Sequence, residues 1–359
     1  MDRLFDRDFL AGRGQVVLTA LIGLAVMFWA ANTLEFFQIF QLTEFLILGI
    51  LAISLAFIWG HGGILCFGQA AFFGLGGYAY ALIAINGMDT SVSLIFAVAI
   101  SAGFAAALGY FMFYGRLSDV YMGVVTLSVT LIFQKLMNST AGPEYAIGEA
   151  RLGGFNGIPS VPTLTSPADP SMPLMPEALY YVAFVALILV YLGLGLLQKS
   201  AFGRVAAAVR ENETRAELLG YDVRRTKLIV FVVGGAVAGL AGGLMASQRA
   251  FIDPNAFGLV LSAQALIWVI VGGLGTLVGP ILGCIALQYL SLWLAEGRFQ
   301  VGGAILDNNL VLGVILMVMV LAVPKGIVPT ARDLGLGAVR RLRGLQVPVA
   351  SKADTGGRT

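Results

Sequence analysis

The chain has 359 residues, of which 58% are apolar and 12% are charged, and its mean hydropathy is +0.88. A soluble domain carries about 25% charged residues, so this composition excludes an ordinary soluble enzyme and indicates a membrane protein. The net charge of +2 is too small to indicate a nucleic-acid-binding protein.

Ten apolar segments are predicted to cross the membrane. A helix needs about 20 apolar residues to cross a hydrocarbon core about 30 Å thick. The segments are residues 15–32, 42–59, 65–86, 91–114, 120–137, 178–198, 227–248, 260–274, 277–295 and 308–324. The expected fold is therefore an all-α membrane protein, a polytopic bundle of about ten transmembrane helices. Residues 1–14 precede the transmembrane domain, 15–331, and a basic, polar tail, 332–359, follows it.

The positions of the basic residues predict the orientation. With the N-terminus inside, ten spans place 18 of the 22 Lys and Arg residues on the side of the two termini. This asymmetry follows the positive-inside rule, so both termini are expected to be cytoplasmic. The first apolar run, Val16–Ala31, is too long for the core of a typical signal peptide and is interpreted as an uncleaved span.

The third span contains a glycine-rich stretch, CFGQAAFFGLGGYAY, from Cys66 to Tyr80. Glycines weaken a helix, and a broken helix at membrane depth is tolerated where it packs in protein or lines a water-filled path. Gln69 adds a polar amide, and neighbouring aromatic rings could form an apolar constriction. The translocation path is therefore expected to include Gln69, Phe72, Phe73 and Tyr78. Ordinary close packing through small residues is the alternative interpretation.

Two further segments interrupt the apolar pattern, one on the outer side of the membrane and one at its inner face. Residues 138–177 form an acidic loop with seven prolines, expected to be periplasmic and either a surface for a soluble partner or a solvated spacer. The stretch WVIVGGLGTLVGP, Trp268–Pro280, is expected to place a tight turn at the inner face.

Residues 199–227, between the sixth and seventh spans, are the most informative segment. They carry seven Lys or Arg and four Asp or Glu, yet Ala and Leu recur at helical spacing. We expect a cytoplasmic loop with a short helix around Val205–Leu219, which docks on a partner protein.

No motif in the sequence indicates a catalytic activity or a metal site. The sequence has no HExxH, GxSxG or Walker A motif and no Cys/His cluster, so no catalytic residue, metal site or cofactor is expected. Cys66 and Cys284 lie in apolar segments and are interpreted as core residues. The chain is therefore predicted not to be an enzyme, and any ATP that drives it must be bound by another chain.

Four pieces of the sequence resemble LivM-type permeases of ATP-binding-cassette (ABC) importers for branched-chain amino acids. They lie within residues 40–330 and are Phe67–Ala84, Tyr121–Phe133 with Leu152–Pro162, Ser200–Ala246 and Ala265–Gly283. The long third piece resembles the cytoplasmic coupling loop of that family, in which a short helix fits a cleft in the ATPase subunit. The matching positions are Arg210, Glu211, Asn212, Glu213, Arg215, Glu217 and Gly220.

The resemblance implies an ABC importer permease fold in a bacterial inner membrane and four partner chains. These are a second related permease, which completes a heterodimer, two ATP-binding subunits and a periplasmic substrate-binding protein. Gln69 stands where many relatives have histidine, and the 138–177 loop is longer than usual. Permeases for urea and short-chain amides share the architecture, so they remain an alternative. A stand-alone channel or ion-coupled carrier is the alternative of another class, although neither needs a charged docking helix.

Overall fold

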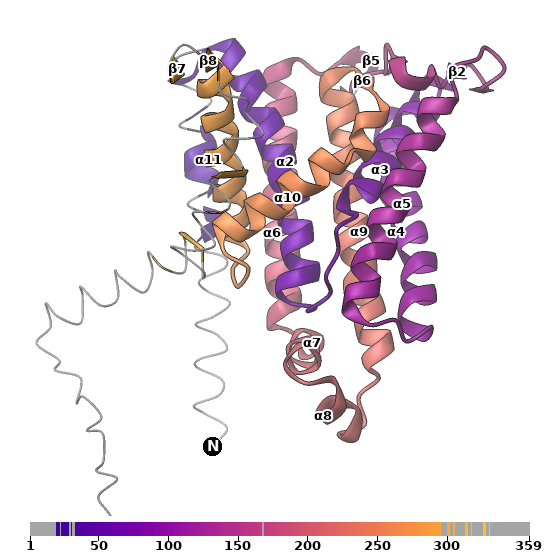
Figure 1. Cartoon of the computed structure of the whole chain (residues 1–359). Coiled ribbons are helices and arrows are strands. Elements are labelled where there is room, and N and C mark those ends of the chain that lie inside the picture. The colour runs from indigo at the N-terminus through magenta and orange to yellow at the C-terminus, as the bar shows by residue number, and fades with distance from the viewer. Residues whose placement is uncertain are drawn as a thin grey trace, which may run out of the picture.

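A computed structural model shows the chain as a bundle of helices (Figure 1). It describes residues 33–166 and 169–295, with a few positions beyond them, 19–21, 23–28, 30, 300–301, 304–305, 313–314, 317, 326–327 and 330. The helices are α2 (Phe36–Gly60), α3 (Gln69–Ile85), α4 (Thr90–Tyr114), α5 (Asp119–Ser139), α6 (Pro176–Lys199), α7 (Ala201–Glu211), α8 (Glu213–Leu218), α9 (Val223–Arg249), α10 (Leu259–Gly272) and α11 (Val278–Ala295). Five of them, α2, α4, α5, α6 and α9, are long and apolar enough to cross a membrane. The expected all-α, polytopic fold is confirmed.

Eight of the helices coincide with the second to ninth predicted spans. Their bounds differ from the prediction by a few residues, and capping explains one example. Helix α9 begins at Val223 rather than at 227, because the Asp222 side chain accepts a hydrogen bond from the backbone N–H of Arg225. The structure describes ten of the 18 residues of the first predicted span, whereas the tenth span lies mostly, and residues 1–14 and 332–359 lie wholly, outside the described residues.

Helices α2 and α9 form the centre of the bundle. Over their most apolar 18 residues, 83% of α2 and 61% of α9 are buried, compared with 28% of α4 and 22% of α5. Helices α4 and α5 therefore turn most of their apolar side chains outward, toward lipid or a partner chain. Helices α7 and α8 lie at one end of the bundle, and strands β2 (Ala150–Arg151), β5 (Asp169–Pro173) and β6 (Phe251–Ile252) lie at the other (Figure 1). We call these the α7–α8 end and the loop end.

Glycines bring α3 and α9 into backbone contact. A Cβ atom at Gly242 would lie 1.8 Å from the carbonyl oxygen of Phe73, and one at Gly76 would lie 2.2 Å from the carbonyl oxygen of Gly239. Helix α3 runs unbroken through Gly74, Gly76 and Gly77, so the expectation that glycines break this span is wrong. Packing against α9 offsets the low helix propensity of glycine, which is the close-packing interpretation.

The non-helical part of the third predicted span precedes α3 instead. Residues 61–68 leave the end of α2 as an irregular segment whose residues are alternately half-buried and buried. Side chains of other helices bind the backbone of this segment and of the first turn of α3: the N–H of Phe67 donates to Thr126 Oγ1 at 3.2 Å, and the N–H of Ala70 donates to Ser262 Oγ at 3.2 Å. Buried irregular backbone is stable inside a membrane protein only when its polar groups are satisfied in this way.

The described residues between α5 and α6 lie over the loop end. They include β1 (Ala146–Ile147), β2 (Ala150–Arg151), the 3₁₀ turn η1 (Gly154–Asn156), β3 (Ile158–Pro159), β4 (Thr165–Ser166) and β5 (Asp169–Pro173). Strand β3 pairs with β6 (Phe251–Ile252), which follows α9 and leads to the 3₁₀ turn η2 (Pro254–Phe257); β7 (Gln300–Val301) pairs with β8 (Ala304–Ile305). The hydroxyl of Tyr80 donates to the carbonyl oxygen of Pro162 at 2.9 Å, and the N–H of Leu164 donates to Ser247 Oγ at 2.8 Å. The segment is thus fixed to α3 and α9.

Candidate functional site

The segment between α6 and α9 folds as two helices, where the sequence predicted one around Val205–Leu219. Ser200 caps α7 by accepting a hydrogen bond from the N–H of Gly203. Asn212 interrupts the helical path with extended backbone (φ −162°, ψ 105°), and its side chain accepts a hydrogen bond from the N–H of Arg215 at 2.9 Å. Asn is a strong N-cap residue, so it starts α8 in a new direction. The expectation of one continuous helix is therefore wrong.

The two helices bury one face and expose the other. Val209, Ala216 and Val223 form a small apolar cluster with Val205 at its edge. The opposite surface carries large apolar side chains in solvent: Leu218 is 82% exposed and Leu219 is 75% exposed. Tyr221, just beyond α8, is also exposed. Isolated exposed apolar residues are common, but a contiguous group beside charged residues is typical of a protein-binding surface.

Sequence reasoning missed this apolar group. The prediction named the charged residues of the coupling loop and expected the Ala and Leu face of one short helix to dock on a partner, but it did not single out these residues. The end of α8 at Leu218 and the positive φ of Gly220 (87°) turn both leucines outward. The dipeptide Leu218–Leu219 directly before a glycine was the available signal, because glycine commonly follows a helix end. We call Leu218, Leu219 and Tyr221 the α8 apolar surface.

The seven predicted coupling residues are all exposed. They are Arg210, Glu211, Asn212, Glu213, Arg215, Glu217 and Gly220. The structure gives two of them contacts inside the bundle, Arg210 and Glu213, and gives Asn212 and Gly220 roles in helix geometry. Their role in coupling to an ATPase stays a prediction.

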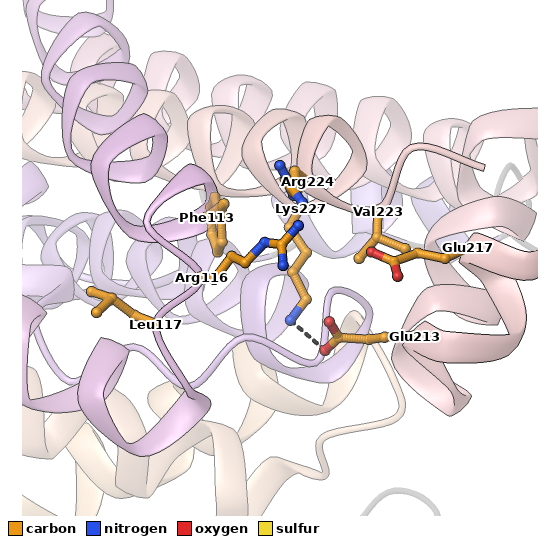
Figure 2. A pocket seen from close by; sticks show the side chains of 8 residues that line it. All are labelled: Phe113, Arg116, Leu117, Glu213, Glu217, Val223, Arg224 and Lys227. Atoms are coloured by element: carbon orange, nitrogen blue, oxygen red, sulfur yellow. Dashed lines mark hydrogen bonds and ion pairs between the residues drawn. The ribbon is translucent and has the colours of Figure 1, made fainter. Parts of the chain in front are cut away.

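Lys227 joins α8 to the transmembrane helices. It lies in the first turns of α9 and is 8% exposed. Its Nζ atom lies 2.5 Å from Glu213 Oε1 of α8 and 3.7 Å from Asp119 Oδ1 at the start of α5. Figure 2 shows this ion pair at the wall of a cavity of about 300 Å³, which is lined by Phe113, Arg116, Leu117, Glu213, Glu217, Val223, Arg224 and Lys227. One cation thus connects three helices at the α7–α8 end.

Arg210 makes the second connection. Its Nη1 atom donates to the carbonyl oxygen of Gly60, the last residue of α2, at 2.5 Å. Its Nη2 atom pairs with Glu211 at 2.6 Å. A Cβ atom at Gly63 would lie 2.7 Å from Arg210 Cγ, so a glycine there lets the arginine stem lie on the segment that leads to α3. Helix α7 therefore contacts the segment between α2 and α3 directly.

His61 lies in that same segment as a neutral side chain. Burial, with smaller contributions from the positive charges of Arg210 and Lys199, lowers the pKa of His61 to about 4. Within the described residues its Nδ1 atom has no hydrogen-bond partner, and its ring stacks on Phe57 at 6.1 Å between centroids. At pH 7 the imidazole adds no charge next to Arg210.

The predicted path residues occupy different surroundings. Gln69 is buried, and its Nε2 atom donates to Ser54 Oγ at 2.7 Å and to the carbonyl oxygen of Gly234 at 3.5 Å. Phe72 is fully buried, with its ring 5.3 Å from that of Phe231. Gln69 therefore faces protein, as its polarity requires, and joins the middles of α2 and α9.

Phe73 and Tyr78 lie toward the loop end. Phe73 lines a cavity of about 620 Å³ that opens there, whereas Gln69, Phe72 and Tyr78 do not line it. The ring of Tyr78 packs against Phe257 at 5.3 Å, and its buried hydroxyl has no hydrogen-bond partner among the described residues. The structure thus brings one of the four path residues to a cavity, and their roles in translocation stay predictions.

Comparison with known proteins identifies the family. Residues 37–323 match the family described as the permease component of branched-chain amino acid transport systems. The chain belongs to this family. No solved structure matches this chain.

Relatives of this permease carry more than one name. It is 29% identical over 304 residues to the high-affinity branched-chain amino acid transport system permease protein LivM of Escherichia coli K12, covering 79% of this chain and 68% of the relative. It is 25% identical over 324 residues to the probable branched-chain amino acid transport permease protein LivM of Methanocaldococcus jannaschii, covering 78% and 90%. It is also 28% identical over 250 residues to the autoinducer 2 import system permease protein LsrC of Enterobacter sp. 638, covering 68% and 66%. The chain is therefore a multi-pass membrane transport permease in a family whose members differ in substrate.

Proposed function

We propose that this chain is the permease subunit of an ATP-driven importer for branched-chain amino acids. It forms half of the translocation path, and a second, related permease forms the other half. Helices α7 and α8 dock onto a separate ATP-hydrolysing subunit in the cytoplasm. A periplasmic binding protein delivers the substrate at the loop end.

The observation that supports the docking is the α8 apolar surface together with its two connections to the bundle. Leu218 and Leu219 are exposed at the tip of the loop, where an apolar groove of a partner can bury them. Lys227 and Arg210 connect the same loop to α9, α5 and the end of α2. A displacement of the docked partner can therefore reach the transmembrane helices through side-chain contacts.

The orientation follows from the charges. The α7–α8 segment and the basic tail carry most of the Lys and Arg residues, which favours a cytoplasmic position for both. The loop end, with its acidic segment 138–177, then faces the periplasm of a bacterial inner membrane. Both termini are cytoplasmic in this topology.

The substrate assignment is supported by the family description and by the names of the LivM relatives. Import of urea or short-chain amides is the alternative. A binding screen of the periplasmic binding protein against leucine, isoleucine, valine, urea and short amides separates the two. Binding of urea or amides alone contradicts the branched-chain assignment.

The docking proposal is tested with a tagged full-length chain purified from its native membrane. We expect an ATP-binding subunit to co-purify, detected by mass spectrometry and by ATP hydrolysis. The amount of ATP-binding subunit that co-purifies with the double variant Leu218→Ser/Leu219→Ser should be at least ten-fold lower. Ile147→Ser/Phe155→Ser, which changes two exposed apolar residues at the loop end, is the matched control. Equal recovery from both variants, or no ATP-binding subunit from wild type, contradicts the proposal.

The topology is tested by cysteine labelling in intact cells. Cys66 and Cys284 are buried, so they leave a low background. An impermeant maleimide should label Arg151→Cys, in the outer loop, and should label Asn212→Cys only after the cells are opened. Labelling of Asn212→Cys from outside contradicts the orientation.

A further inference from the structure

The cavity at the loop end combines charged and apolar walls. Its volume of about 620 Å³ lies within the range of small-molecule sites. Its walls come from α2, α3, α5, α9, α10, α11 and the β6–η2 segment, and include Glu44, Leu48, Phe73, Met245, Arg249 and Asp253. A bare packing defect between helices would carry neither ion pairs nor several amides.

Charge and apolarity are separated by depth in this cavity. Glu44 and Leu48 are four residues apart on α2, and Met245 and Arg249 are four residues apart on α9, so each pair shares a helix face. In both helices the charged residue is nearer the loop end, and the apolar residue lies about 6 Å deeper along the helix axis. Phe73 of α3 adds an aromatic ring to the walls. The mouth is therefore charged, and a deeper level is apolar.

The charges at the mouth form an ion pair. Arg249 Nη2 contacts Glu44 Oε1 across the cavity. The side chains are 49% and 22% exposed, so water screens the pair and its disruption costs little. Asp253, hydrogen bonded to Asn255 Nδ2 at 2.7 Å, supplies a second carboxylate to the same cavity. The guanidinium of Arg249 and the carboxylate of Glu44 can each bind an oppositely charged group of a ligand. If the ligand carries one charge of each sign, the net charge of the site does not change.

That arrangement favours a zwitterion over an ion. A single anion or cation would bind one member of the pair and separate it from the other, so the ion pair that is lost offsets the contact that is gained. A zwitterion satisfies both members at once. Within the described residues, the side chains of Gln134, Gln264 and Gln288 make no hydrogen bond and remain available to a polar ligand.

We infer that this cavity binds an α-amino acid with an apolar side chain. The α-carboxylate binds Arg249 in a charge-assisted hydrogen bond, and the α-ammonium binds Glu44. The side chain points toward Leu48 and Met245. This inference rests on the proposed function, and it adds a substrate site within the permease between delivery at the loop end and passage through the bundle.

The test uses the full-length chain in lipid nanodiscs and three probe molecules that share the same branched hydrocarbon chain. They are L-leucine, leucinol, which lacks the carboxylate, and 4-methylpentanoate, which lacks the ammonium. Saturation-transfer NMR reports weak binding through the methyl protons of each probe. We expect a signal from L-leucine and signals at least ten-fold weaker from the other two. Equal signals from the three probes overturn the inference, as does binding of urea without binding of L-leucine.

The double variant Glu44→Gln/Arg249→Gln removes both charges and keeps the shape of the side chains. Its L-leucine signal should fall at least ten-fold. Glu149→Gln/Arg151→Gln, two exposed residues at the same end, should leave the signal unchanged. If the first variant does not fold, Glu44→Asp keeps the charge and shortens its reach, and the signal should fall about five-fold. If Glu44→Gln/Arg249→Gln or Glu44→Asp folds and its L-leucine signal is unchanged, the inference is overturned.

Recovery of the ATP-binding subunit is measured with the same wild-type and variant chains. If the subunit is recovered but L-leucine does not bind, the cavity assignment alone is wrong. If no ATP-binding subunit is recovered from wild type, the proposed function itself is wrong.

Discussion

Helices α3 and α9 meet backbone to backbone, whereas α8 meets α9 through the small apolar cluster of Val209, Ala216 and Val223 and through the end of one lysine side chain. Between α3 and α9, glycines leave no room for a Cβ atom at Gly76 or Gly242. Between α8 and α9, Lys227 and Glu213 make an ion pair whose carboxylate is half exposed. Helices α3 and α9 cannot shift slightly against each other, because their backbones are already in contact and cannot interpenetrate. The ion pair between Lys227 and Glu213 can break and form again at little cost.

This difference indicates how the two regions move. Helix α4 joins the close-packed unit through the same kind of contact, since Ser101 Oγ donates to the carbonyl oxygen of Phe72 at 2.9 Å and a Cβ at Gly239 would meet Ser101 at 2.4 Å. Helices α3, α4 and α9 should therefore move as one body. The α7–α8 loop should be able to shift against that body.

The largest effect is expected where the backbone contact is broken. Gly242→Ala places a methyl group 1.8 Å from the carbonyl oxygen of Phe73, which cannot move without shifting α3. We expect at least a ten-fold loss of folded protein, measured by fluorescence-detected size-exclusion chromatography. Gly103→Ala in α4 is the control, because a Cβ there meets no atom within 4 Å. Normal folding of Gly242→Ala would show that α3 and α9 can separate.

The ion pair of α8 should be less costly to lose. Lys227→Met removes the partner of Glu213 and Asp119, both well exposed, so the loop should loosen by about 1 kcal/mol without unfolding the bundle. Trypsin should then cut after Arg215 about five-fold faster in the purified chain. Arg225→Met, an exposed cation of the same helix turn, is the control. An unchanged cleavage rate would mean that Lys227 does not hold α8.

A smaller effect is expected from the exposed charges of the loop. Glu211→Ala/Arg215→Ala should uncouple transport from ATP hydrolysis while membrane insertion stays normal. Because surface charges contribute little singly, the double variant should act more clearly than either single one. The amount of ATP-binding subunit that co-purifies with this double variant should fall by a few-fold, which is less than the fall expected for Leu218→Ser/Leu219→Ser. Transport at the wild-type rate in the assembled double variant would contradict the coupling role.

The smallest effect is a pH dependence from His61. Its pKa is about 4 in the folded chain and 6.5 as a free side chain, so the unfolded chain binds the proton first as the pH falls. Stability should therefore decrease between about pH 6.5 and pH 4. We expect the thermal midpoint to fall by about 2–4 °C from pH 7 to pH 5. His61→Gln should remove this part of the decrease, and an identical profile in that variant would contradict a buried, neutral His61.

Hydropathy was sufficient to predict the spans, because 20 apolar residues have few alternatives to a membrane helix. It could not predict where the third span becomes helical. Residues 61–68 stay irregular because Thr126 and Ser262, far away in the sequence, bind the neighbouring backbone. The same limit applies to α3, where glycines that weaken a helix locally are favoured by contact with Gly239 and Gly242.

The candidate sites were predictable only in part. The charged loop was visible in the sequence, but the outward position of Leu218 and Leu219 depends on the break at Asn212. The cavity was not predictable, since Glu44 and Arg249 are 205 residues apart and meet only in the folded bundle. Phe72 was chosen as a constriction, yet it is fully buried between rings, so Phe72→Ala should cost about 3–5 kcal/mol of stability besides any effect on transport.

The length of α10 has a consequence for hydration. Its 14 residues span about 21 Å, less than the hydrocarbon thickness of about 30 Å. The irregular backbone at its two ends therefore lies at membrane depth, where contact with lipid tails is unfavourable. At the end near Gly258 the cavity meets this requirement, because water that fills it can solvate the exposed amides. In the proposed transport role, a solute that enters this cavity would keep part of its hydration shell below the bilayer surface and would lose its water in two steps rather than one.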